Sequence, residues 1–200
     1  MNEMHLVMHG LAIKKHASAE DVAGVLGLDP DEVRETLAKL VAVKRAVEVK
    51  GRYLLSPAAR MLLDADYSRY YEAERAHPAF QAGYAGFERL NTVLKQLITD
   101  WQTIPVRGER VPNDHDDKDY DAKIVDRLGD LHERVEPVIN QLATALPRMK
   151  IYGEKLAAAL EKAEKGEFAW VSDAKIESYH TVWFELHEDL LRLMRRERAE

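Results

Sequence analysis

The chain has 200 residues, of which 46% are hydrophobic and 32% charged, and its formal net charge is −6 at pH 7. This length accommodates a small domain beside a larger one, and the charge argues against a protein that coats nucleic acid nonspecifically. The lack of cysteine excludes disulfides and thiolate metal sites. No apolar run approaches the roughly 20 residues of a membrane helix, and His5 and His9 interrupt the apolar stretch near the start. We therefore expect a cytoplasmic protein without membrane association.

Two short helices separated by a tight turn are predicted near the N-terminus. Ser18, followed three positions later by Asp21, gives the first helix an N-cap, and Gly27 ends it. Asp29 and Pro30 provide an N-cap and a proline at the first position of the second helix. Both helices have an apolar face at helical spacing, made by Val22, Val25, Leu26, Val33, Leu37 and Leu40.

A small hairpin is predicted after these helices. Residues 47–55 alternate apolar and polar side chains on both sides of Lys50 and Gly51, which indicates two strands turned at the glycine. Ser56 and Pro57 then cap and begin another helix.

Residues 1–63 resemble the MarR-like branch of winged helix-turn-helix regulators. The resemblance is carried by the turn at 26–30, the helix at 31–40, and the strand, Ser-Pro and helix start at 51–60. It implies a winged helix-turn-helix domain over residues 1–63, with the hairpin as its wing, that binds DNA as a homodimer on a palindrome. Similar modules also occur, fused or accessory, beside enzymes that handle phosphoenolpyruvate.

The charges of this domain bear on DNA binding. Residues 1–63 carry nine Lys and Arg against eight Asp and Glu, although phosphate neutralisation supplies most nonspecific affinity for DNA. The first turn of the second helix, which faces DNA in a helix-turn-helix, carries Asp31, Glu32 and Glu35. The alternative is that these acids complement the helix dipole and that the fold binds a protein instead. The candidate DNA-binding residues are Arg34, Lys39, Lys44, Arg45, Lys50, Arg52 and Arg60.

Residues 64–200 are predicted to form an antiparallel helical bundle, which makes the fold mainly α. Asn91 lies in an apolar seam from Phe80 to Trp101, where a buried asparagine usually fixes register or oligomeric state. The predicted elements are a connecting helix at 64–77, a loop at 103–117, and helices at about 79–102, 118–146, 148–166 and 173–198.

An acidic run at residues 113–121 invites comparison with a calcium loop. Counted from Asp117, the sixth position is Ala122 instead of glycine, and the twelfth is Leu128 instead of glutamate. An acidic helix N-terminus explains the run without a metal, and we predict no metal site.

Histidines on apolar helix faces are the unusual feature of the bundle. His180 and His187 project into the apolar arc of the last helix, and His132 lies at the shoulder of another apolar face. Their ring nitrogens need partners, which are either neighbouring side chains in a structural role or a bound ligand. A single metal cannot accept both His180 and His187, because residues seven apart are displaced by about 10.5 Å along a helix. The candidate ligand-binding residues are His132, His180, Trp183 and His187.

The sequence contains no phosphate-binding glycine loop, no nucleophile elbow and no His-Glu-x-x-His, so neither an enzyme nor a cofactor is predicted. Two functions remain. The first is a DNA-binding transcriptional regulator whose helical bundle dimerises or senses a ligand. The second is a module that binds a protein partner, for example as the accessory subunit of a metabolic enzyme, and never touches DNA.

Overall fold

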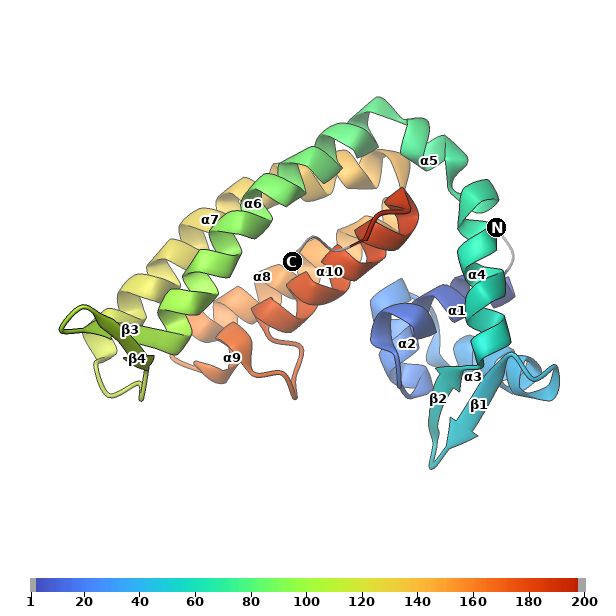
Figure 1. Ribbon diagram of the computed structural model, residues 1–200, viewed down its shortest axis with the longest axis horizontal. Coiled ribbons are helices and arrows are strands. Elements are labelled where there is room, and N and C mark those ends of the chain that lie inside the picture. Colours follow the sequence, from blue (N-terminus) through green and yellow to red (C-terminus); the bar gives the residue numbers. More distant parts are fainter. Residues whose placement is uncertain (1–2, 198–200) are drawn as a thin grey trace. The chain divides into compact units, whose positions relative to one another are not determined.

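The computed structural model describes residues 3–197 and is mainly helical, as predicted (Figure 1). It divides into two compact units. Unit 1 comprises Met1–His77 together with Glu185–Glu200, and unit 2 comprises Pro78–Phe184. The sequence instead predicts a boundary after residue 63 and assigns the whole last helix to the bundle. In the described chain, no helix combines the length and the apolarity that crossing a membrane requires.

Unit 1 contains three helices, a hairpin and two further helices, followed by the C-terminal part of α10. Its elements are α1 (Glu3–Lys14), α2 (Ala19–Leu26), α3 (Pro30–Ala42), β1 (Ala46–Val49), β2 (Arg52–Leu55), α4 (Pro57–Tyr70), α5 (Glu72–Ala76) and the end of α10 (Tyr179–Met194).

The helix starts of unit 1 are fixed by the predicted caps. The Ser18 hydroxyl accepts a hydrogen bond from the Asp21 backbone N–H at 3.1 Å, and the Asp21 carboxylate accepts one from Ser18 N–H at 3.0 Å. The Asp29 carboxylate accepts from the first backbone N–H groups of α3, and Ser56 caps α4 in the same way. These bonds satisfy backbone donors that have no partner within the helix.

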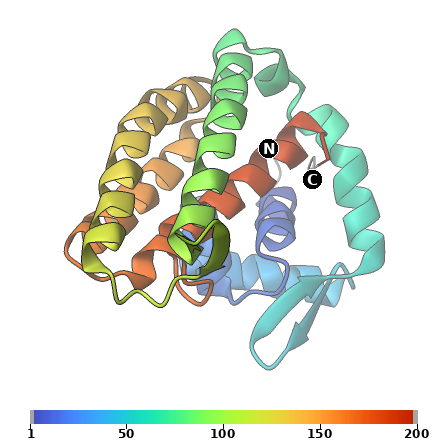
Figure 2. The ribbon, with the colours of Figure 1, turned by 60° about the vertical axis from the view of Figure 1, so that its left-hand side comes forward.

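The hairpin has a two-residue turn. Strands β1 and β2 pair antiparallel from Ala46 opposite Leu55 to Val49 opposite Arg52, which leaves Lys50 and Gly51 at the turn. Both turn residues have positive φ, 52° and 76°, as a type I′ hairpin turn requires. Figure 2 shows the hairpin projecting from the helices of unit 1.

Unit 2 is built on two long helices that run side by side in both views (Figures 1 and 2). Gly83 and Gly86 of α6 allow a close approach to α7, because a Cβ atom on either would lie within 3 Å of Leu142 or Val138 side-chain atoms. Its elements are α6 (Pro78–Gln102), β3 (Thr103–Val106), β4 (Glu109–Pro112), α7 (Lys118–Ala145), the 3₁₀ turn η1 (Pro147–Met149), α8 (Lys150–Glu164), α9 (Ala169–Ser172) and the first part of α10.

The segment predicted as a loop at 103–117 contains a second hairpin. Strands β3 and β4 pair antiparallel around Arg107 and Gly108, which both have positive φ. Pro105 and Pro112 argue against strands in the sequence, but each strand of a two-stranded sheet is an edge strand, where proline is tolerated. Arg110 anchors the hairpin to α6, because its guanidinium donates to Asp100 at 2.6 Å.

Two helix boundaries also differ from the predictions. The connecting helix at 64–77 is divided at Tyr71 between α4 and α5. The last helix begins at Tyr179 instead of residue 173, because Ser178 supplies its cap by accepting from Thr181 N–H at 3.3 Å. The Asp173 carboxylate caps a local turn by accepting from Lys175 N–H at 2.8 Å.

Candidate functional site

Two predicted DNA-binding arginines form ion pairs within unit 1. Arg34 on α3 donates to Glu20 at 2.6 Å and also pairs with Asp31, and these two hydrogen-bonded carboxylates raise the pKa of Arg34. Arg52 of β2 lies 3.2 Å from Asp21 and donates to a backbone carbonyl. Both guanidinium groups thus neutralise acids of their own unit.

The other five predicted DNA-binding residues differ from these two arginines. Within residues 3–197, none of them forms an ion pair. Arg45 is half-buried, and the other four side chains are exposed. One lies on the second half of α3, two follow the end of α3, one is at the hairpin turn and one is on α4. We call these residues the free cations: Lys39, Lys44, Arg45, Lys50 and Arg60.

Three valines that lie near these cations along the chain are exposed to solvent. Val43, Val47 and Val49 are 55%, 46% and 47% exposed. Val47 and Val49 alternate along β1, so both point to one face of the hairpin, away from the face that buries Ala46. We name these three residues the valine patch. Their exposure was not predicted from the sequence.

In unit 2, two of the predicted ligand-binding residues gather around Tyr179. His132 is buried and its Nδ1 is hydrogen-bonded to the Tyr179 hydroxyl at 3.2 Å. Trp183 stacks near Tyr179 and on Phe87, and its indole N–H donates to the Asn91 side-chain oxygen at 2.9 Å. The single indole donor therefore has a partner within the protein, and Asn91 has a role as its acceptor.

The other two histidines do not join this cluster. His180 is half-buried on α10, and its burial lowers its pKa, as burial also does for His132. His187 is buried and belongs to unit 1, although it lies on the same helix. The structure thus brings together only His132 and Trp183 of the four predicted residues.

Unit 1 contains a buried polar network that sequence reasoning did not find. The fully buried His9 donates through Nε2 to Asp189 at 2.9 Å, while its Nδ1 lies 2.7 Å from the Tyr67 hydroxyl. Lys14 and Glu185 form a second pair between α1 and α10, at 2.7 Å. These contacts join α1 to α4 and to the end of α10. The sequence signals were a histidine, His9, within an apolar stretch, and two acids, Glu185 and Asp189, among the leucines of α10.

His5, one helical turn before His9, lies in a different environment. Its ring is 2% exposed and packs against Tyr70 at 4.4 Å between ring centroids. Neither ring nitrogen has a hydrogen-bond partner, and the nearest carboxylate, Asp66, lies 3.9 Å from Nδ1. Burial, together with the neighbouring His9, lowers the pKa of His5 to about 4.

The acidic run is explained by hydrogen bonds within unit 2. The buried Asp121 carboxylate accepts from Asn113 at 2.9 Å and lies 3.1 Å from His115 Nδ1. Asp117 caps α7 by accepting from Tyr120 N–H at 3.0 Å. Among residues 3–197, no group of three or more histidine, aspartate or glutamate side chains is arranged to hold a metal ion.

Comparison of the chain with protein-family models, curated proteins and solved structures finds no match.

Proposed function

We propose that α1 to α4 form a winged helix-turn-helix that binds duplex DNA, and that the protein is a transcriptional regulator. The order of three helices, a hairpin and a further helix supports the proposal, as does the tight turn between α2 and α3. In such a domain α3 enters the major groove and the hairpin lies along the backbone.

The observation that carries the proposal is the division of the cations into two groups. Arg34 and Arg52 offset two of the three negative charges of Glu20, Asp21 and Asp31, which would otherwise repel phosphate. Four of the free cations, Lys39, Lys44, Arg45 and Lys50, remain to neutralise phosphates. We assign DNA contact to the second half of α3 and to the hairpin turn, because Glu32 and Glu35 stay exposed on the first half of α3.

The test is fluorescence anisotropy of the full chain with DNA from upstream of its own gene and with a scrambled duplex. Binding is measured between about 50 and 200 mM salt, where phosphate contacts have a large effect. The double variant Lys44→Glu, Lys50→Glu is expected to weaken binding and to reduce the salt slope by about 0.9 for each phosphate that is no longer neutralised. A variant of equal charge change, Lys95→Glu with Lys123→Glu on exposed positions of unit 2, is the control.

Equal loss of affinity in both double variants would show that only the total charge matters and would overturn the assigned surface. Binding that does not distinguish the two duplexes would argue against a regulator. A homodimer on a palindromic site stays a prediction, which sedimentation of the protein–DNA complex would test.

The valine patch favours a second candidate function, in which the same fold binds a protein partner. Exposed valines on a strand face suit an apolar protein surface better than a phosphate backbone. Placing a photo-crosslinking amino acid at Val47 in the native host tests this candidate, with Lys165 in unit 2 as the control position. A defined protein adduct at position 47 alone, together with no DNA binding at low salt, would favour it over the regulator.

A further inference from the structure

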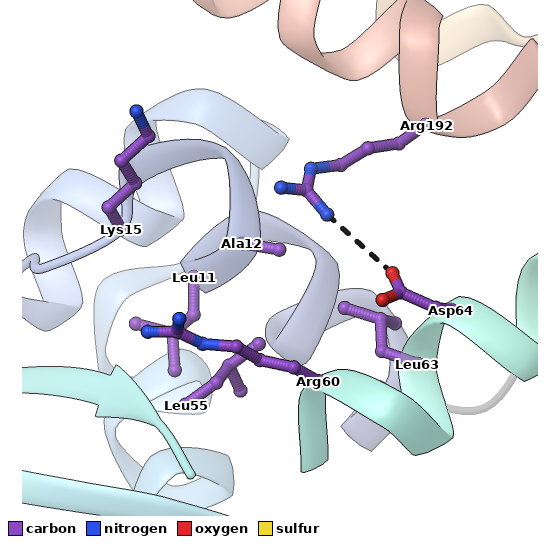
Figure 3. A pocket seen from close by; sticks show the side chains of 8 residues that line it. All are labelled: Leu11, Ala12, Lys15, Leu55, Arg60, Leu63, Asp64 and Arg192. Carbon is purple, nitrogen blue, oxygen red and sulfur yellow. Dashed lines mark ion pairs between the residues drawn. The ribbon is translucent and has the colours of Figure 1, made fainter. Parts of the chain in front are cut away.

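Unit 1 contains a recess of about 250 Å³ where α1, the end of β2, α4 and the C-terminal part of α10 meet. It belongs wholly to unit 1, whereas His132, His180 and Trp183, which were predicted to bind a ligand, belong to unit 2. Figure 3 shows the side chains that line it, which are Leu11, Ala12, Lys15, Leu55, Arg60, Leu63, Asp64 and Arg192.

The apolar part of the recess is aliphatic. Leu11, Leu55 and Leu63 are at most 3% exposed, and Ala12 lies beside them. No aromatic ring is among the lining residues, so the wall offers methyl and methylene groups and no stacking surface. The volume is slightly below the range of about 300 to 1,000 Å³ that is usual for ligand sites, which limits the occupant to a small molecule.

The polar part of the recess is positively charged. The lining residues include three cations, Lys15, Arg60 and Arg192, and one carboxylate, Asp64, which lies nearest to Arg192 (Figure 3). The Arg60 side chain extends across Leu11 and Leu55, so that its guanidinium lies over the aliphatic wall (Figure 3). Within residues 3–197 Arg60 forms no ion pair. An anion entering the recess therefore meets a cation that no carboxylate of the described chain neutralises.

Arg192 retains hydrogen-bonding capacity. Its guanidinium lies 3.9 Å from Asp64, beyond hydrogen-bond distance, and donates to Glu188 at 2.7 Å. Its Nε is buried and has no hydrogen-bond partner. The nitrogen that Arg192 offers to an acceptor in the recess is therefore Nη1, on the side of Asp64, and not the buried Nε.

We propose that this recess binds a small monocarboxylate with a short aliphatic body. The carboxylate accepts hydrogen bonds from Arg60, whose planar group matches carboxylate geometry, and the aliphatic body covers the leucines. Arg192 adds positive charge at the end of the recess where Asp64 lies. The proposal goes beyond DNA binding and does not depend on it, because it concerns a ligand of the protein alone. Inorganic phosphate would meet the arginines but leave the aliphatic wall unfilled, and an amine would be repelled.

The experiment measures binding to the full chain without DNA, by isothermal titration calorimetry and by the shift of the melting temperature. The probes are 4-methylpentanoate, its neutral amide 4-methylpentanamide, acetate and inorganic phosphate. We expect saturable binding and a raised melting temperature with 4-methylpentanoate, and much weaker effects with the other three. Because no DNA is present, failure here and failure of the DNA-binding proposal are separate results.

Three variants locate the site. Arg60→Gln removes an exposed cation and is expected to weaken binding about tenfold, in line with the removal of a charged hydrogen bond. Asp64→Asn removes the competing carboxylate and is expected to strengthen binding roughly threefold. Arg69→Gln, on the same helix and 74% exposed but outside the recess, is the control and should leave affinity unchanged.

The proposal is overturned if the amide binds as tightly as the carboxylate, or if phosphate or acetate does. It is also overturned if Arg69→Gln weakens binding as much as Arg60→Gln. Absence of saturable binding up to about 10 mM, a concentration that would detect even weak affinity, overturns it as well.

Discussion

The buried polar cluster around His9 in unit 1 and the one around Tyr179 in unit 2 are built in different ways. Unit 1 places a histidine, an aspartate and a tyrosine in one fully buried network, His9 with Asp189 and Tyr67. The cluster around Tyr179 in unit 2 uses groups without a formal negative charge, since Trp183 donates to an asparagine and His132 contacts a phenol. A buried carboxylate needs all its hydrogen bonds, so the His9 cluster tolerates the removal of a partner less well than the Tyr179 cluster.

The largest expected effect comes from breaking the network in unit 1. Asp189→Ala removes the acceptor of His9 and leaves a buried imidazole donor without a partner, so we expect a loss of about 3 kcal/mol in the free energy of unfolding. Urea denaturation followed by circular dichroism measures it. Asp130→Ala, an exposed aspartate on α7, serves as the control and should change stability by less than about 0.5 kcal/mol. Equal effects of the two variants would show that the network contributes nothing.

The second effect is a dependence of stability on pH that arises from His5. The pKa of His5 is about 4 in the folded protein and about 6.5 when unfolded, so between these values only the unfolded chain binds the proton. Stability is therefore highest above about pH 6.5 and falls as the pH drops toward 4, by roughly 3 kcal/mol from this residue. His132 and His180 in unit 2 have lowered pKa values and act in the same direction.

His5→Phe isolates this contribution. Phenylalanine keeps the ring contacts with Tyr67 and Tyr70 but has no nitrogen to protonate or to leave unpaired. We expect stability at pH 7.5 to rise by about 1 kcal/mol, and the fall between pH 6.5 and 4 to become shallower. Denaturation at several pH values measures both, with His16→Gln on an exposed position as the control. An unchanged pH profile would show that another group is responsible.

A smaller effect is expected in unit 2. Asn91→Ala removes the acceptor of the Trp183 indole N–H and should cost about 1 kcal/mol, because Asn91 is half-buried and water can replace part of the bond. A double-mutant cycle with Trp183→Phe separates the hydrogen bond from the change in side-chain volume. Additive effects of the two changes would mean that the bond does not stabilise the fold.

The sequence predicts contacts between residues that are close in the chain and misses those between distant residues. Caps such as Ser18 and Asp29 were predicted correctly because the side chain and the backbone N–H that it binds are three residues apart or fewer. The pair of His9 and Asp189 is separated by 180 positions, and no local pattern connects them. The division of α10 between two units is equally non-local, which is why His187 was grouped with His180.

The predicted boundaries of helices and loops were wrong where two local sequence signals competed. Ser172 and Ser178 are both plausible helix caps, and the structure uses the second. In the segment 103–112 the prolines indicated a loop, but Arg110 fixes a hairpin by binding Asp100 on α6. The aliphatic and cationic recess of unit 1 combines side chains from four elements, so its existence depended on packing that the sequence does not display.

The last prediction compares the effect on stability of replacing one glycine in each unit. Gly51 has φ of 76° at the hairpin turn, so Gly51→Ala should destabilise unit 1 by about 1 kcal/mol through backbone strain, although no atom lies within 4 Å of the added methyl group. Gly129 lies within α7, where an added Cβ would meet only a carboxylate oxygen, at 3.7 Å, so Gly129→Ala should stabilise by up to about 1 kcal/mol. Thermal denaturation of the two variants should therefore shift the melting temperature in opposite directions. A gain in stability from Gly51→Ala would contradict the turn geometry of the hairpin, on which the assigned position of Lys50 depends.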